Sequence, residues 1–173
     1  SGVDKHVLFV GGGYSSDNSK GKTVLAINVI TGQVIKQFTS GMTYSFPGTV
    51  SVIDEDGDGY TDKVYAGDLG GQMWRFSSFT DPDDGSTLTF PECNEIIDHA
   101  SYPWTGQVFF QTDENHSRKF FYPPSVTLEK GYDLVFMGTG DRENACCNND
   151  TSACSSSEPD MLCAVKDTHT STT

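Results

Sequence analysis

Apolar residues come in short runs of about five along this chain, and Gly, Asp, Asn and Ser separate the runs. The runs are rich in β-branched and aromatic residues, which favour strands. Beyond one helical turn expected over 92–99, no segment sustains the 3.6-residue apolar period of a helix, so we predict an all-β protein. The predicted strands are 7–10, 23–29, 33–38, 49–53, 63–67, 72–76, 107–111, 119–122, 125–128, 132–137 and 161–165.

A loose repeat links these strands. Strands that end in glycine occur at Phe9-Val10-Gly11, Tyr65-Ala66-Gly67 and Phe136-Met137-Gly138, and a turn or loop and a second strand follow each. Such strand-turn-strand units in series predict part of a β-propeller, with about three blades and long inserted loops. Three blades do not close a ring. We therefore expect a partial β-propeller domain over 1–166 and a polar, disordered tail over 167–173.

An acidic loop joins two of the predicted strands and follows the pattern D-x-D-x-D-G-x-x-D over 54–62. Calcium takes oxygen ligands from alternate positions of a curled loop. Asp54, Asp56 and Asp58 occupy positions one, three and five, and Asp62 occupies position nine. Tyr60, at position seven, offers its backbone carbonyl. The pattern predicts one Ca²⁺ held by these five residues, and magnesium fits less well because it requires tight octahedral geometry.

The loop departs from the EF-hand in two ways. Position twelve is Tyr65 and not a bidentate Glu, and strands rather than helices flank the loop. Gly59 falls at position six, where an EF-hand loop turns sharply. Glu55 lies between ligand positions and adds a further negative charge. The alternative interpretation is a solvated acidic turn that binds no metal.

The formal net charge of −13 argues against nucleic acid or an anionic membrane surface as a partner. No apolar run approaches the roughly 18 residues of a membrane-spanning helix.

Cysteines are concentrated in the last third of the chain. Because that stretch is polar and lacks the C-x-x-C spacing of common zinc sites, we expect disulfides in an oxidising compartment. Two disulfides should join four of the cysteines in some pairing, which leaves Cys93 free or bonded elsewhere. The four are Cys146, Cys147, Cys154 and Cys163.

Trp74 and Phe76 alternate along one predicted strand with Arg75 between them. Core packing is the more frequent use of such an aromatic pair, and ligand stacking is the alternative. Arg75 then points to the opposite face, where we expect an acidic partner.

With these motifs in place, the chain resembles the C-terminal propeller of the PilC/PilY family of type IV pilus tip and biogenesis proteins. The similarity covers about 7–166, and its most specific part is Y-A-G-D-L-G-G-Q-M-W-R-F over 65–76. The Cys-rich stretch over 146–163 is not part of the family pattern. The other matching motifs lie at 9–13, 24–32, 54–62, 124–126 and 136–142.

This resemblance implies a non-enzymatic protein that binds calcium at the acidic loop and acts in pilus biogenesis, adhesion or twitching motility. It implies pilin subunits or minor pilins as partners, and a host or surface ligand as a further one. It also implies a place at the pilus tip on the cell surface, reached through the periplasm.

Two other resemblances give alternatives. The stretch 46–62 is similar to an FG-GAP repeat of integrin-type propellers, which use the same acidic loop. The hairpin at Thr31-Gly32 resembles repeats of quinoprotein dehydrogenases, which would make the chain a fragment of an enzyme. Such an enzyme needs a ring of tryptophans, whereas this chain has Trp74 and Trp104.

Overall fold

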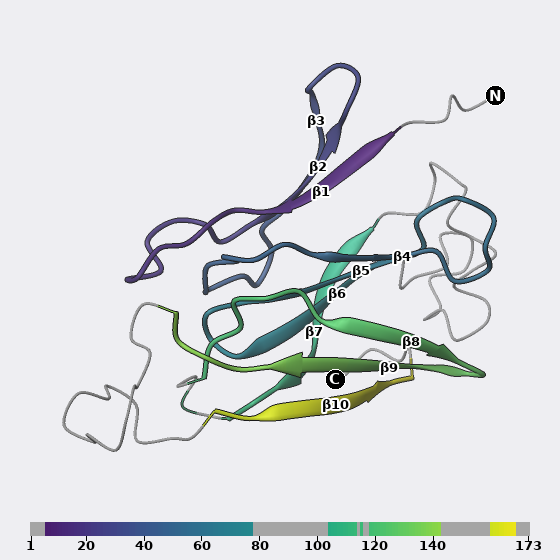
Figure 1. The fold of residues 1–173 in the computed structure, drawn as a ribbon. Helices are drawn as coiled ribbons and strands as arrows, with labels where there is room; N and C mark the ends of the chain where they lie inside the picture. The colour runs from purple at the N-terminus through teal and green to yellow at the C-terminus, as the bar shows by residue number, and fades with distance from the viewer. Residues whose placement is uncertain (1–5, 78–103, 114, 116–117, 143–159, 169–173) are drawn as a thin grey trace.

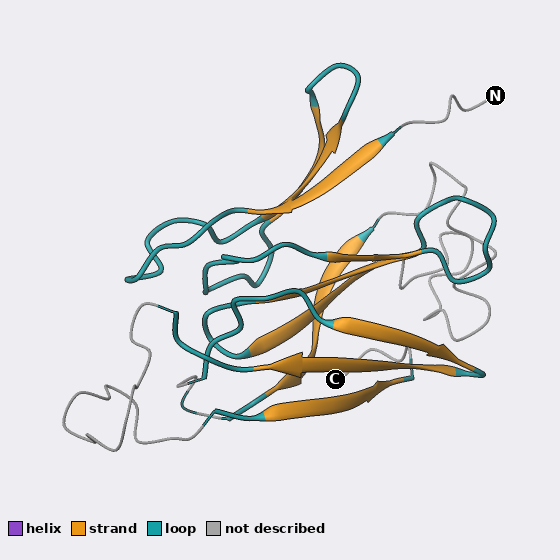
Figure 2. Cartoon of the chain, in the orientation of Figure 1, coloured by secondary structure: helices purple, strands orange, loops and turns teal. Residues whose placement is uncertain are grey.

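A computed structural model describes residues 6–77, 104–113, 115, 118–142 and 160–168. The described residues form ten strands and no helix (Figures 1 and 2). No described segment can therefore serve as a membrane-spanning helix. The strands are β1 (Val7–Gly11), β2 (Val24–Asn28), β3 (Val34–Phe38), β4 (Ser51–Ile53), β5 (Lys63–Gly67), β6 (Gln72–Ser77), β7 (Thr105–Gln111), β8 (Ser125–Glu129), β9 (Tyr132–Gly138) and β10 (Leu162–Asp167).

The strands build three antiparallel sheets: β1-β2-β3, β4-β5-β6-β7 and β8-β9-β10. Within each sheet, neighbours in space are neighbours in the chain, which is the meander of a propeller blade. Figure 1 shows the sheets one above another, with β4-β5-β6-β7 between the other two. The predicted all-β class and three propeller-like sheets are thus confirmed.

Ten of the eleven predicted strands are present, with ends within two residues of the prediction. The prediction of a strand over 119–122 is wrong. Phe120 and Phe121 are buried there as a loop segment, and the Phe120 amide donates to the carbonyl of Asp68 at 3.0 Å. An apolar run alone cannot distinguish a strand from a loop that packs against a sheet. The helical turn predicted over 92–99 lies outside the described residues.

The predicted tail begins at Asp167, but β10 includes that residue. Its side chain is buried and pairs with Arg75, whose acidic partner the sequence pattern had predicted. Residues 169–173 lie outside the described part of the chain.

The two central strands of the middle sheet, β5 and β6, are buried on both faces, and alternate residues along each strand point to opposite faces. One core cluster lies toward the first sheet and includes Val24, Phe38, Val64, Trp74 and Phe76. Core packing of Trp74 and Phe76 is thus confirmed.

A second cluster lies toward the third sheet. It includes Tyr65, Met73, Val135, Met137 and Cys163. The two clusters fix the position of the middle sheet, and with it the base of the acidic loop that joins β4 to β5.

Asp68 organises the turn between β5 and β6. One carboxylate oxygen accepts the amides of Gly70 and Gln72, each at 2.9 Å, and the other accepts Nε1 of Trp74 at 2.9 Å. A Cβ at Gly70 would lie 2.3 Å from the ring of Tyr44, so this position requires glycine. The conspicuous G-D-L-G-G-Q-M-W motif is therefore a structural turn.

Candidate metal centre

The acidic loop leaves the middle sheet at the end of β4 and returns at β5. Its base is closed by the Asp62 amide, which donates to the carbonyl of Ile53 at 2.9 Å. Asp54, Asp56 and Asp58 are all exposed, and one carboxylate oxygen from each lies within 4.8 Å of the others. The structure thus brings three of the five predicted ligands together.

Hydrogen bonds within the loop keep it curled. Asp54 accepts the amides of Gly57 at 2.8 Å and Gly59 at 3.0 Å. Both glycines adopt left-handed backbone angles, φ 80° and 92°, which a side chain would disfavour. Asp56 accepts the amide of Asp58 at 3.1 Å. The short loop therefore turns tightly enough to gather its carboxylates.

Tyr60 and Asp62 hold different positions from the exposed triad. The Tyr60 amide donates to Asp58 at 2.8 Å, and its side chain is exposed, so a metal contact would use the backbone carbonyl as predicted. Asp62 is only 3% exposed, and its carboxylate accepts the amide of Glu55. It is not one of the three clustered carboxylates.

Burial and negative neighbours both act on Asp62. The pKa of the Asp62 carboxyl is raised to about 6, first by burial and then by the charges of Asp56, Asp54 and Asp58, while the hydrogen bond from the Glu55 amide acts to lower it. Ionised Asp62 therefore carries a free-energy cost that a nearby cation would remove. Carboxylate oxygens in a curled loop suit a hard cation such as Ca²⁺ better than zinc or copper.

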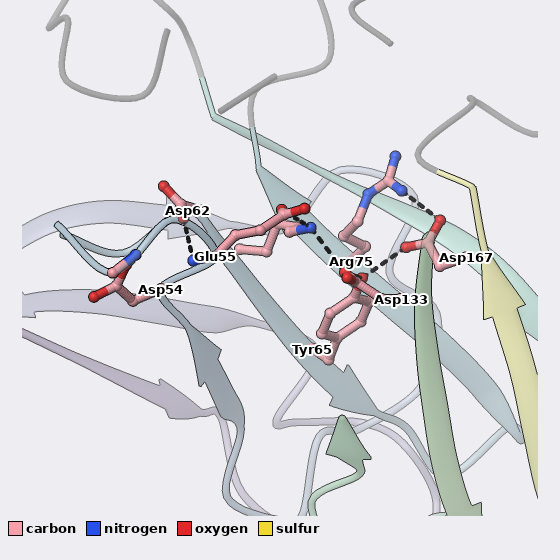
Figure 3. Close-up of polar contacts among 9 residues, drawn as sticks. Asp54, Glu55, Asp62, Tyr65, Arg75, Asp133 and Asp167 are labelled. Carbon is pink, nitrogen blue, oxygen red and sulfur yellow. Dashed lines mark hydrogen bonds and ion pairs between the residues drawn. The ribbon is translucent and has the colours of Figure 1, made fainter. Parts of the chain in front are cut away.

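A buried network of charges begins beside this loop (Figure 3). The Lys63 ammonium forms ion pairs with Glu55 and, at 2.7 Å, with Oδ2 of Asp133. All three side chains are buried. Because Asp133 belongs to β9, this network ties the acidic loop to the third sheet.

The network continues through Tyr65. Its hydroxyl lies 2.7 Å from Oδ2 of Asp133 and 2.8 Å from Oδ2 of Asp167, so one proton is shared between two carboxylates. Arg75 pairs with the other oxygen of Asp167 at 2.5 Å. Burial, then the charges of Asp167 and Asp133, raise the pKa of Tyr65 far above its usual value, and Arg75 lowers it only in part.

Sequence reasoning missed this network apart from the acidic partner of Arg75. A usable signal is present, because Lys63, Arg75 and Asp133 interrupt otherwise apolar strands. Charged residues are rarely buried unless they are paired, so such interruptions indicate buried ion pairs.

Cys163 faces the second core cluster as a free, buried thiol, and burial raises its pKa. The other cysteines, at 93, 146, 147 and 154, lie outside the described residues. The two disulfides therefore stay a prediction.

Comparison with known proteins adds family relationships. The family model described as the PilY1 beta-propeller domain matches residues 2–115. A type IV pilus biogenesis factor PilY1 from Pseudomonas aeruginosa strain UCBPP-PA14 is 32% identical over 77% of this chain. A PilY1 homolog from Xylella fastidiosa is 40% identical over 39% of the chain. The chain spans only 12% and 5% of the lengths of these relatives.

The solved structures include a similar fold. The crystal structure of the C-terminal domain of Pseudomonas aeruginosa PilY1 superimposes with a TM-score of 0.64 and 19% sequence identity. The similarity covers 96% of this chain and 36% of that one. The chain thus has the fold of about a third of that domain.

Proposed function

The chain belongs to the PilY1 β-propeller family, and on this premise we propose that it is a non-enzymatic, calcium-binding propeller segment of a type IV pilus protein. Its proposed roles are pilus biogenesis, adhesion or twitching motility. One observation carries the proposal: the family match includes the acidic loop, where the carboxylates of Asp54, Asp56 and Asp58 gather within 4.8 Å.

Calcium would be held by this exposed triad together with the Tyr60 carbonyl and Asp62. The ion would supply positive charge to a loop of mutually repelling carboxylates, and it performs no chemistry in this proposal. Because an unfolded loop offers no preformed site, binding stabilises the folded state. The raised pKa of Asp62, which comes first from burial and then from the charges of Asp56, Asp54 and Asp58, supports the same idea, since a bound cation would favour the ionised carboxylate.

The proposed partners are pilin subunits or minor pilins, with a host or surface ligand as a further partner. The proposed location is the pilus tip at the cell surface, reached through the periplasm. The names of the relatives support a place in the type IV pilus system. The net charge of −13 disfavours nucleic acid as a partner.

The two alternatives, a quinoprotein-like dehydrogenase fragment and an integrin-like FG-GAP module, have less support. Trp74 packs edge-on against Phe46, with 5.9 Å between the ring centroids. Trp104 stacks on Phe9, with 5.7 Å between the ring centroids. Both indoles are therefore engaged in packing. Adding the quinone and recording its absorbance tests the enzyme alternative directly.

Calcium titration of the 173-residue chain tests the metal site. Calcium binding to the wild-type chain should produce a measurable heat and should raise the melting temperature. The calcium dissociation constant should be roughly 10⁻⁴ to 10⁻³ M, or lower if the flanking strands hold the loop rigid. Asp56→Asn should weaken binding, whereas Asp160→Asn, at an exposed aspartate outside the loop, should not. Absence of heat and of a melting shift, or equal behaviour of the two variants, would show that the loop is only an acidic turn.

Testing the proposed role in the pilus requires the full-length gene. Asp56→Asn and Asp160→Asn are introduced separately, and surface pili and twitching are measured beside the amount of the protein. We expect a defect with Asp56→Asn alone. Deletion of the whole segment with normal piliation, adhesion and motility would contradict the proposed role.

A further inference from the structure

Glu55 differs from the loop residues on either side of it. Asp54 and Asp56 are exposed, whereas the Glu55 side chain is only 6% exposed and points into the protein (Figure 3). It lies between two predicted ligand positions. Glu55 therefore adds a charge to the loop without being placed to bind the cation.

Two contacts connect Glu55 to both the site and the protein interior. Its backbone amide donates to the carboxylate of Asp62, the predicted ligand at position nine. Its own carboxylate pairs with the buried ammonium of Lys63. A shift of Glu55 would thus disturb a ligand and a buried ion pair together.

Lys63 carries the connection across to the third sheet. Its ammonium donates to Oδ2 of Asp133 at 2.7 Å, and the Tyr65 hydroxyl lies 2.7 Å from the same oxygen. An ammonium buried between two carboxylates stays in place, because any displacement leaves a buried charge without compensation. Glu55 is therefore fixed, through Lys63, to a buried carboxylate of β9 in the third sheet.

We propose that Glu55 is a positioning residue for calcium. Because Lys63 links its side chain to Asp133, Glu55 holds Asp62 and the start of the loop where they can bind the cation. This inference rests on the proposed calcium site. Preorganising a site lowers the ordering cost of binding. Partners that orient metal ligands typically change metal affinity by about 10- to 100-fold when they are replaced.

A second explanation is that Glu55 acts only through its negative charge. Two variants separate charge from position. Glu55→Asp keeps the charge but shortens the side chain, so that its carboxylate no longer reaches Lys63. Glu55→Gln keeps the length and an acceptor oxygen for Lys63 but removes the charge. Positioning predicts the larger loss of calcium affinity for Glu55→Asp, and charge alone predicts the larger loss for Glu55→Gln.

The experiment measures calcium dissociation constants by calorimetry, and the calcium-dependent shift of the melting temperature, on the whole 173-residue chain. Circular dichroism without calcium checks that each variant folds. Glu129→Asp makes the same chemical change at an exposed site on β8 and is the matched control. We expect about a 10-fold or greater loss of affinity with Glu55→Asp, a smaller loss with Glu55→Gln, and none with Glu129→Asp.

Asp133→Asn tests the far end of the connection without altering the loop. Asp133→Asn should weaken calcium binding. If Glu55→Asp does not fold, the Asp133→Asn variant is used to test the proposal instead. Wild-type affinity in Glu55→Asp or in Asp133→Asn, or a larger loss with Glu55→Gln, would overturn the positioning role. Failure of the wild-type chain to bind calcium would instead overturn the proposed metal site.

Discussion

The indole Nε1 of Trp74 donates to Oδ2 of Asp68 at 2.9 Å, and both side chains are buried. The carboxylate that shapes the β5–β6 turn thereby also orients a ring of the first core cluster. Turn and core are thus joined by one side chain.

Asp68→Ala should therefore destabilise the protein by about 3–5 kcal/mol. The substitution removes three hydrogen bonds to an ionised acceptor and leaves a buried indole N–H without this partner. Urea unfolding measures the change. Glu129→Ala, at an exposed position on β8, should change stability by less than about 0.5 kcal/mol. Equal midpoints for the two variants would show that the turn does not depend on this carboxylate.

Gly70→Ala should lower the free energy of unfolding by about 1–3 kcal/mol, because the added methyl group overpacks the turn. Its Cβ would lie 2.3 Å from the ring of Tyr44, so the ring or the turn would have to shift. Gly138 is a matched control at the end of β9, because a Cβ there meets no atom within 4 Å. Thermal unfolding of both alanine variants decides the point, and a Gly70→Ala protein as stable as Gly138→Ala would contradict it.

Asp167→Ala should destabilise the chain by about 3–5 kcal/mol, because it leaves the buried guanidinium of Arg75 without the carboxylate 2.5 Å away. Asp160→Ala, at an exposed aspartate just before β10, is the control. Denaturant unfolding compares them. If Asp167 behaved like the polar tail that the sequence suggested, the two variants would unfold together.

Counting thiols in unreduced, unfolded protein tests the two predicted disulfides. One reactive thiol is expected if Cys146, Cys147, Cys154 and Cys163 are all paired, because the chain has five cysteines. Four or five reactive thiols, or bound zinc, would exclude the disulfides. In the folded chain the thiol of Cys163, if free, should react slowly, because burial limits access and raises its pKa.

These cases show which features the sequence could predict. Strands appear as local patterns of apolar residues, so their positions were predicted closely, and the ligand spacing of the acidic loop is equally local. The carboxylates of Asp133 and Asp167, which meet Lys63, Tyr65 and Arg75, lie between 68 and 102 residues away from them along the chain. No local pattern specifies which carboxylate crosses from another sheet to meet them. Glu55 was interpreted as loop charge for a different reason, because it lies between the exposed acidic residues Asp54 and Asp56, although its side chain is a buried ion-pair partner of Lys63.

Tyr65 provides a prediction with a defined pH direction. Its folded-state pKa is raised above the usual value of about 10, first by burial and then by the carboxylates of Asp167 and Asp133. The folded state thus binds the phenolic proton more tightly than the unfolded state does. The resulting stability is complete below about pH 10 and is lost as the pH rises beyond it, by at most about 1.4 kcal/mol per pH unit.

Ultraviolet titration of tyrosinate tests this directly. The protein has seven tyrosines, and Tyr65 should ionise only when the chain unfolds. Tyr65→Phe should therefore leave the titration of the folded protein unchanged, while it lowers the absorbance of the unfolded protein by one tyrosine. The same variant should lose stability less steeply above about pH 10. A native titration curve that loses one tyrosine on substitution would show that Tyr65 ionises in the folded state, and that its proton is not held between Asp133 and Asp167.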